Sequence, residues 1–252
     1  MPERVATRLY VSAGLVEGGA VFVEPPQRHR LRNVLRLRPG AAVAGFNSRD
    51  GEFLCRIVTL DHHRGFLKIE TRLRDPEPIA ESDPWLVFAP IKRLRLDLVI
   101  EKGTELGVSA FIPVVTALTQ PERPQRNRMI AHAIAAVEQS ERLAVPEIRP
   151  VEPLSAVLAV WPLERRLILC DETGGGVPMA EALEVLPAGA PAALLIGPEG
   201  GFAQTELDAL ANLPFVTRAG LGPRVLRAET AALAALAVFQ AIAGDWRRTR
   251  PR

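Results

Sequence analysis

The chain has 252 residues, of which 48% are hydrophobic and 24% are charged, and its formal net charge is +2. This composition excludes a disordered chain and fits one large globular domain or two modest ones. No stretch approaches the roughly 18 consecutive apolar residues of a membrane-spanning helix, and the N-terminus carries charges where a secretory signal needs an apolar run, so we expect a cytoplasmic protein.

Residues 1–75 alternate short apolar runs with turn residues, as in AVFVEP, AAVAGFN, EFLCRIVTLD and GFLKIETRLR. This spacing predicts a small β-barrel or sandwich with one short helix near residues 29–35. The run Asp61-His62-His63 is expected to form a hairpin turn between the last two strands.

The segment RHRLRNVLRLR, residues 28–38, contains five arginines and no acid. One interpretation is a solvated amphipathic segment with Leu31, Val34, Leu35 and Leu37 turned inward. The other, which we weigh equally, is a surface that binds a nucleic-acid backbone, since guanidinium groups make bidentate contacts with phosphate. It would consist of Arg28, Arg30, Arg32, Arg36 and Arg38. For the excess of arginine over lysine in the whole chain, we favour a genome rich in arginine codons as the main cause.

The stretch DPEPIAESDP, residues 75–84, is rich in proline and acid and predicts a linker at residues 76–84. From Trp85 onward the pattern of apolar and polar residues changes. The apolar runs WLVFAPI, AFIPVV, RLILCD, AALLIG and FVTRAGL alternate with helical patterns near residues 93–106, 127–142 and 205–211 and with a final helix. This rhythm predicts an α/β domain at residues 85–252 with a parallel sheet.

Ligands of such sheets bind beyond the carboxyl ends of the strands, where three glycine-bearing loops are expected: CDETGGG, IGPEGGF and GPRVLRAETA. None of them matches a P-loop or a dinucleotide-binding fingerprint. His29, His62, His63 and His132 lack metal-ligand spacing, so we expect no metal site. Cys55 and Cys170 are expected to be inert core thiols.

These loops combine glycines, which permit close backbone approach, with stiffening prolines at Pro198 and Pro223. They are suited to holding an adenine and a ribose through main-chain groups. The final helix, AETAALAALAVFQAIAG, is apolar around most of its circumference, so we expect it to be buried on nearly all sides, against another element or a second subunit. At its start, Arg224, Arg227, Glu229 and Thr230 would line a crowded site or form a purely structural ion-pair cluster.

The blocks LLIGPEGGF and LGPRVLRAETA resemble the C-terminal signature of the ribosomal RNA small subunit methyltransferase E family, which belongs to the SPOUT methyltransferases. The resemblance extends over the chain, because HRLRNVLRLRPG, KRLRLDLVIEKGTELGVSAFIPV and EQSERLAVPEI match further blocks in order. It implies a PUA-like RNA-binding β-barrel at residues 1–75, followed by a SPOUT-type parallel sheet with a deep trefoil knot.

The resemblance implies a homodimer that transfers a methyl group from S-adenosylmethionine to N3 of a uridine in small-subunit ribosomal RNA, free or in the assembled subunit, without a metal or membrane. It places catalysis on Arg227, Glu229 and Arg224, with Glu199 as a second candidate base. The cofactor-binding residues would be Leu195, Ile196, Gly197, Pro198, Glu199, Gly200, Gly201, Leu221, Gly222, Val225, Leu226, Arg227 and Thr230. Two alternatives stay open: a non-catalytic RNA-binding assembly factor, and a SPOUT methyltransferase acting on another RNA or on a ribose 2′-hydroxyl.

Overall fold

The computed structural model describes residues 4–77, 79–80, 83–120, 124–187 and 189–246. The chain divides into two compact units. One unit comprises the residues up to 79 together with residues 134–145, and the other comprises residues 80–133 and those from 146 onward. Among the described residues, none of the helices is long and apolar enough to cross a membrane.

The first unit is built on a five-stranded sheet with the order β1-β3-β4-β5-β2. The strands β1 and β3 are parallel, and the other neighbours are antiparallel. The core of the unit consists of apolar side chains that alternate along the strands, including Leu9, Val43, Phe53, Ile57 and Leu67. The strands are β1 (Arg8–Tyr10), β2 (Ala20–Phe22), β3 (Ala42–Asn47), β4 (Gly51–Leu60) and β5 (Gly65–Arg74).

The turn between β4 and β5 is closed by Asp61, as the sequence predicted. Its carboxylate accepts hydrogen bonds from the backbone N–H groups of His63 and Arg64, both at 2.7 Å. These bonds stabilise the ionised carboxylate and lower the pKa of Asp61 below its ordinary value. The histidines of this turn therefore belong to a hairpin.

The arginine-rich segment forms the short helix α1 (Pro25–His29), which continues as the π-helical turn η1 (Arg30–Val34). Of its apolar residues, Leu31 is fully buried and Leu37 is partly buried against the core. Val34 and Leu35 are 65% and 37% exposed, so the expectation that both turn inward is wrong. A single helical turn offers too few positions on its inner side to bury all four.

Residues 134–145 include the end of helix α3 (Arg126–Ser140) and are held to the five-stranded sheet by Arg8. Its guanidinium donates to the Glu52 carboxylate at 2.7 Å, to the carbonyl of Val137 at 3.0 Å and to that of Arg142 at 3.0 Å. It also lies 4.0 Å from the centre of the Phe46 ring. Each nitrogen of this nearly buried guanidinium thus has an acceptor, as burial of a charge requires.

The second unit contains a sheet of eight strands, of which seven lie in the order β11-β13-β10-β12-β6-β7-β8 and β9 pairs with β7. Every pairing in it is parallel, as the long apolar runs predicted. The strands are β6 (Trp85–Phe88), β7 (Ala110–Val115), β8 (Glu147–Ile148), β9 (Glu152–Pro153), β10 (Arg166–Cys170), β11 (Val177–Pro178), β12 (Ala192–Ile196) and β13 (Val216–Gly220).

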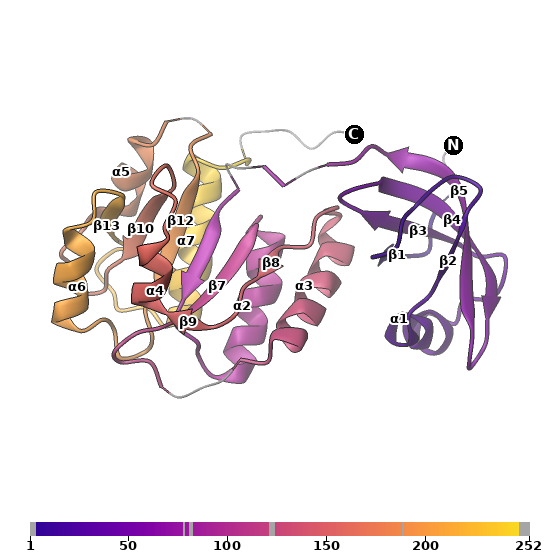
Figure 1. The fold of residues 1–252 in the computed structure, drawn as a ribbon, viewed down its shortest axis with the longest axis horizontal. Helices are drawn as coiled ribbons and strands as arrows, with labels where there is room; N and C mark the ends of the chain where they lie inside the picture. Colours follow the sequence, from indigo (N-terminus) through magenta and orange to yellow (C-terminus); the bar gives the residue numbers. More distant parts are fainter. Residues whose placement is uncertain (1–3, 78, 81–82, 121–123, 188, 247–252) are drawn as a thin grey trace. The chain divides into compact units, whose positions relative to one another are not determined.

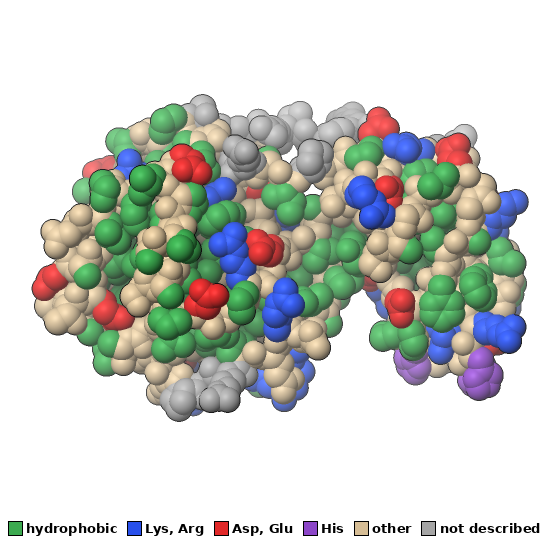
Figure 2. Space-filling view, viewed as in Figure 1, with side chains coloured by type: hydrophobic (Ala, Val, Ile, Leu, Met, Phe, Trp, Pro, Cys, Tyr) green, Lys and Arg blue, Asp and Glu red, His purple; other side chains and the backbone are tan. Residues whose placement is uncertain are grey.

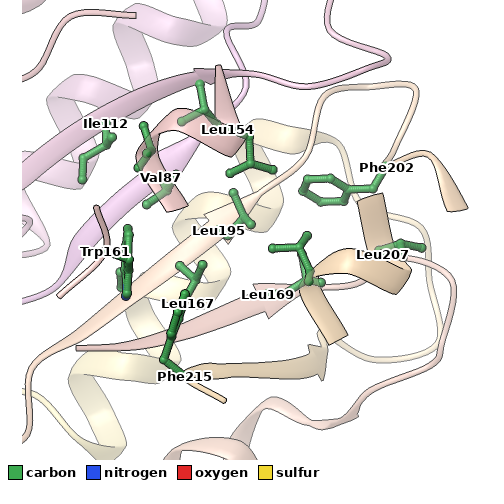
Figure 3. Packing of buried hydrophobic residues seen from close by; sticks show 14 of the residues in the cluster. Val87, Ile112, Leu154, Trp161, Leu167, Leu169, Leu195, Phe202, Leu207 and Phe215 are labelled. Atoms are coloured by element: carbon green, nitrogen blue, oxygen red, sulfur yellow. The ribbon is translucent and has the colours of Figure 1, made fainter. Parts of the chain in front are cut away.

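Helices cover both faces of this sheet, with α4 and α6 on one face and α2 and α7 on the other (Figure 1). Leu167, Leu169 and Leu195 point to the first face and pack with side chains of α4 and α6, as Figure 3 shows. The helices are α2 (Arg93–Glu105), α4 (Leu154–Ala159), α5 (Met179–Glu184), α6 (Gln204–Ala211) and α7 (Ala228–Ile242).

Helix α7 is buried on one side only, through Ala228, Ala232, Ala235, Leu236, Phe239 and Gln240. Its other side carries a stripe of partly exposed apolar residues: Leu233, Ala234, Ala237 and Val238. Within one chain, the expectation that α7 is buried on nearly all sides is therefore wrong.

Candidate active site

The three glycine-bearing loops lie at the carboxyl ends of neighbouring strands. The loop after β10 begins at Asp171, the loop after β12 at Gly197 and the loop after β13 at Leu221. Because β10 lies between β12 and β13 in the sheet, its loop is flanked by the other two. Neighbouring strands are about 4.8 Å apart, so all three loops fall within the breadth of one small ligand.

Close packing explains two glycines of the loop after β12. A β-carbon on Gly197 would lie 2.7 Å from the ring of Phe202, which is 6% exposed and reaches into the core beside Leu207 (Figure 3). Gly201 has a φ of +71°, and a β-carbon there would collide with the carboxylate of Glu172 from the loop after β10. The loops after β10 and β12 are thus in contact at Gly201, where the positive φ favours glycine.

A buried ion pair fixes the loop after β10. The Asp171 carboxylate, fully buried, accepts from Nε of Arg218 on β13 at 2.9 Å and from the hydroxyl of Thr173 at 2.7 Å. Burial by itself would raise the pKa of Asp171, but the hydrogen bonds from Thr173 and Arg218 lower it below its ordinary value. The carboxylate is therefore an ionised anchor between two strands.

The loop after β13 is the most open of the three. Gly222 has a φ of +96° and nothing within 4 Å of the position of a β-carbon. Arg224, Val225, Arg227 and Thr230 are exposed, and Leu221 and Leu226 are half-buried. Neither Arg224 nor Arg227 forms an ion pair with a described residue.

One cation joins the loop after β12 to the start of α7. The guanidinium of Arg95, in the first turn of α2, lies 3.5 Å from Oε1 of Glu199 and 3.4 Å from Oε1 of Glu229. The Glu229 side chain is 14% exposed, and its Oε2 is buried without a hydrogen-bond partner among the described residues. A buried carboxylate oxygen without a donor is unfavourable, so this atom is poised to accept a hydrogen bond from a ligand.

The predicted cofactor loops therefore divide into a buried and an open part. Leu195 and Ile196 are buried at the end of β12, Pro198 and Gly201 are buried in its loop, and Glu199 and Gly200 are exposed. The partner of Glu229 is Arg95, which is not among the four residues of the ion-pair cluster that the sequence suggested at the start of α7. The ion-pair network thus differs from the expected one in its cation.

The five arginines of residues 28–38 belong to the first unit and differ in their contacts and exposure. Arg30 forms an ion pair with the buried carboxylate of Glu138. Arg32 lies 2.8 Å from a ring nitrogen of His62 in the hairpin turn, while Arg36 and Arg38 are exposed and Arg28 is half-buried. Histidine side chains reach the surface near α1 with a basic side chain beside one of them (Figure 2). Four of the five arginines thus remain available for a phosphate backbone.

Sequence reasoning missed Arg95, although a signal was present. The first turn of α2 carries Arg93 and Arg95 and no acid, and Lys92 precedes it. Cations are unfavourable at the positive end of a helix dipole, so such a cluster indicates a local anion or an anionic ligand. Arg218 was missed as well, because it lies within a strand that otherwise reads as buried.

Two cavities accompany these elements in the second unit. One, of about 90 Å³, is lined by residues that follow β6 and β7, at the same edge as the loops. The other, of about 200 Å³, includes Trp85 at the first position of β6 and lies toward the opposite edge. In the described part of the chain, no group of three or more His, Cys, Asp or Glu residues could hold a metal ion.

Comparison of the sequence with known proteins identifies a family and its relatives. Residues 80–240 match the RNA methyltransferase domain family. Two curated relatives are both named ribosomal RNA small subunit methyltransferase E. The one from Bacillus subtilis is 31% identical over 84% of this chain and 86% of its own length, and the one from Rickettsia conorii is 29% identical over 91% and 93%.

Solved structures agree over nearly the whole chain. The ribosomal RNA small subunit methyltransferase E from Neisseria gonorrhoeae, solved bound to S-adenosyl methionine, has a TM-score of 0.82, with 28% identity over 95% of this chain and 99% of its own. A putative methyltransferase from Legionella pneumophila, solved with bound SAM, has a TM-score of 0.83, with 28% identity over 95% and 98%.

The parallel sheet with its three loops and the family match over residues 80–240 thus define an RNA methyltransferase. Within that class, the chain belongs to the ribosomal RNA small subunit methyltransferase E family.

Proposed function

We propose that this protein transfers the methyl group of S-adenosylmethionine to N3 of a uridine in small-subunit ribosomal RNA. The observation that carries the proposal is the buried, unpartnered Oε2 of Glu229, held by Arg95 beside the loops that would bind the cofactor. Such an acceptor suits a reaction in which a proton must leave the nitrogen that becomes methylated. Since ribosomal RNA is its substrate, we place the protein in the cytoplasm.

The residues of the site fit this cofactor. The contact between Gly201 and Glu172 closes one side of the cradle, and the open space beside Gly222 leaves the other side accessible. When bound, S-adenosylmethionine supplies an activated methyl group, whose bond to sulfur breaks as the bond to the acceptor nitrogen forms. The proposed cradle consists of Leu195, Ile196, Gly197, Pro198, Glu199, Gly200, Gly201, Leu221, Gly222, Val225, Leu226, Arg227 and Thr230.

The side chains of this protein would then accept the proton that leaves and stabilise the negative charge that develops. The N3 proton of the uridine passes to Oε2 of Glu229, or to Glu199 as the second candidate. Arg227 and Arg224 offset the negative charge that develops on the pyrimidine. Arg95 keeps Glu229 in place through its Oε1, which leaves Oε2 for the acceptor.

Assembly into a homodimer would complete the surroundings of the proposed site. The apolar stripe of α7, Leu233, Ala234, Ala237 and Val238, is only half covered within one chain. A second copy that buries this stripe would also shield the nearby start of α7 from water, which strengthens electrostatic interactions there.

We further propose the deep trefoil knot and the PUA-like barrel of this family. The knot is supported by the strand order, in which β13 returns to β10 on the side opposite β12 before the chain continues into α7. The barrel at residues 1–75 would contact RNA through Arg28, Arg32, Arg36 and Arg38, joined by a linker at residues 76–84 to the methyltransferase domain at 85–252. Residues 78 and 81–82 of that linker lie outside the described residues.

The test is incubation with methyl-labelled S-adenosylmethionine and small ribosomal subunits, or naked ribosomal RNA, from a strain that lacks the protein. Reverse transcription then maps the product, because N3 methylation blocks the pairing edge and stops the polymerase. Label in a base that gives no stop, or in a ribose hydroxyl, would contradict the proposal. Failure to bind S-adenosylmethionine in calorimetry would instead favour a non-catalytic RNA-binding factor.

A further inference from the structure

The outward side of the five-stranded sheet carries an exposed aromatic pair. Phe22 of β2 and Phe66 of β5 are direct cross-strand partners, and their ring centres lie 5.6 Å apart at an interplanar angle of 72°. The two residues are 46% and 39% exposed. Val58, which is 54% exposed, lies at the β-bulge of β4 opposite this part of β5. Soluble proteins usually bury such side chains, so a cluster of them at the surface indicates a partner.

The alternation of side chains along β5 places cations beside this pair. Leu67 and Ile69 are each 1% exposed and point into the core, so Phe66 and Lys68 stand together on the outward side. Arg64 immediately precedes the strand and is exposed as well. Along the chain, the ring of Phe66 is therefore bracketed by a cation two residues before it and another two residues after it.

These two cations have no internal anion. Neither Arg64 nor Lys68 forms an ion pair or a side-chain hydrogen bond with a described residue. The Glu70 carboxylate, on the same side of β5, is bound by Nε of Arg56 at 3.2 Å and by its terminal nitrogen at 3.0 Å. The Asp61 carboxylate accepts from the backbone N–H groups of its own turn. Both positive charges thus remain available for an anion from outside.

The pair is also close to the arginine-rich segment. A β-carbon on Gly65 would lie 3.5 Å from Cδ of Arg28 in α1. Glu24, two residues after Phe22, is exposed and adds one negative charge. If Glu24 is counted against Arg28, Arg64 and Lys68 still leave the surroundings of the pair with a net positive charge. The aromatic pair is thus continuous with the surface proposed above to contact an RNA backbone.

Aromatic rings among unpaired cations suit a nucleic acid that offers a free base. A base stacks on an aromatic side chain whatever its sequence, and its flanking phosphates are attracted by arginine and lysine. A base inside a duplex keeps its faces stacked on its neighbours and cannot make this contact. Stable protein–protein interfaces bury about 800 Å² on each partner, which three apolar side chains do not supply.

We infer that Phe22 and Phe66 form a stacking platform for an unpaired base of RNA, with Arg64 and Lys68 at the phosphates on either side. The inference rests on the proposed function for the identity of the partner as RNA. The arginines of residues 28–38 contact only a backbone, whereas this platform holds a base that is free of its duplex. It therefore favours a single-stranded or bulged segment next to the proposed backbone contacts.

The test compares Phe66→Leu with Phe66→Trp. Leucine keeps an apolar side chain but has no ring, and tryptophan keeps a ring on which a base can stack. The measurement is the Kd for small ribosomal subunits from a strain that lacks the protein, which does not depend on methyl transfer. We expect Phe66→Leu to weaken binding about tenfold and Phe66→Trp about twofold or less. The thermal midpoint and the affinity for S-adenosylmethionine should stay near wild type in both. Wild-type binding by Phe66→Leu, or equal Kd values for the two variants, would overturn the inference.

The phosphate contact is tested by the salt dependence of the same Kd. Lys68→Gln should reduce the slope of log Kd against log salt by about one, as loss of one phosphate contact does. The control is Arg49→Gln, which also removes one exposed cation, but one that is already paired with Asp50 at 2.8 Å. An unchanged slope in Lys68→Gln, or an equal fall in Arg49→Gln, would contradict a phosphate at Lys68.

A second copy of the chain is the other occupant to test. Phe66→Glu should sediment as the wild type does, because the platform is open to RNA and is not covered by another protomer. A change of oligomeric state in this variant would overturn the inference. A wild-type protein that binds small subunits through the platform but transfers no methyl group would overturn the proposed function alone.

Discussion

The guanidinium of Arg95 lies 3.4 Å from Oε1 of Glu229, at the start of α7, and contacts Glu199 at 3.5 Å with the same group. One side chain of α2 thereby ties two segments that are far from it in the sequence. The arrangement leaves Oε2 of Glu229 buried without a partner, which is costly unless a ligand completes it.

Replacement of Arg95 by alanine should reduce methyl transfer about tenfold or more, because Glu229 would lose the contact that orients it. Arg95→Lys should recover part of the rate, since it keeps the charge but not the fork of donors. The measurement is kcat and KM for both substrates, with circular dichroism as the control for folding. Wild-type kinetics in Arg95→Ala would remove Arg95 from the mechanism.

Glu229→Gln keeps the size of the side chain but cannot accept the N3 proton as a carboxylate does. We expect a loss of kcat of about a hundredfold, within the usual range for a general base, and a near-normal affinity for S-adenosylmethionine. Single-turnover rates as a function of pH provide the readout. If the variant retains the wild-type rate and pH profile, Glu199 becomes the base to test by the same substitution.

Arg227→Ala should lower turnover strongly while the fold remains intact, because the exposed Arg227 makes no ion pair with a described residue that would be needed for stability. The comparison variant is Arg166→Ala, an arginine at the start of β10 whose guanidinium donates to the carbonyl of Pro214 at 2.6 Å. Turnover and the thermal midpoint should both be recorded. A variant with unchanged turnover would exclude a catalytic function for Arg227.

The pair formed by Asp171 and Arg218 predicts a pH dependence of stability. The pKa of Asp171 is lowered in the folded protein, so its contribution is fully present above the unfolded pKa, near 3.9, and is lost as the pH falls through the lower folded value. Asp171→Asn should cost about 1–3 kcal/mol at pH 7, and the difference from wild type should shrink below about pH 4. Urea unfolding at several pH values measures it, and a constant difference would contradict the prediction.

The two cysteines should be unreactive in the folded protein. Burial raises the pKa of Cys170 to about 12 and that of Cys55 to about 11, so both thiols remain protonated at pH 8. A chromogenic disulfide reagent should therefore modify neither thiol rapidly until denaturant is added, after which both should react. Fast modification of the native protein would show that one of them is accessible.

The open stripe on α7 can be tested through the oligomeric state. Ala237→Arg places a charge in the middle of the stripe and should shift the protein from dimer to monomer in sedimentation. Thr205→Arg, on the exposed side of α6, is the control and should leave the dimer unchanged. A wild-type monomer would refute the homodimer directly.

Much of the second unit could be predicted because its pattern is local. Long apolar runs separated by helical periods indicated parallel strands, and the structure confirms all five of the predicted runs as strands. The short helices α4 and α5 were not predicted, since six residues give too few turns for a helical period to emerge. The exposure of Val34 and Leu35 was also missed. The alternation of apolar and polar residues in the sequence does not distinguish a helical turn at the surface from a buried one.

The sequence by itself determined the sheet, the glycine-bearing loops and the family, because each depends on residues close together in the chain. Only the tertiary structure decided which charges meet: Arg95 with Glu199 and Glu229, and Asp171 with Arg218. These partners belong to separate strands and helices, and their meeting depends on the order β13-β10-β12-β6, which no local pattern encodes. The cavity beside Arg93 also depends on the tertiary structure, since it exists only where the chain after β6 packs against the start of α3.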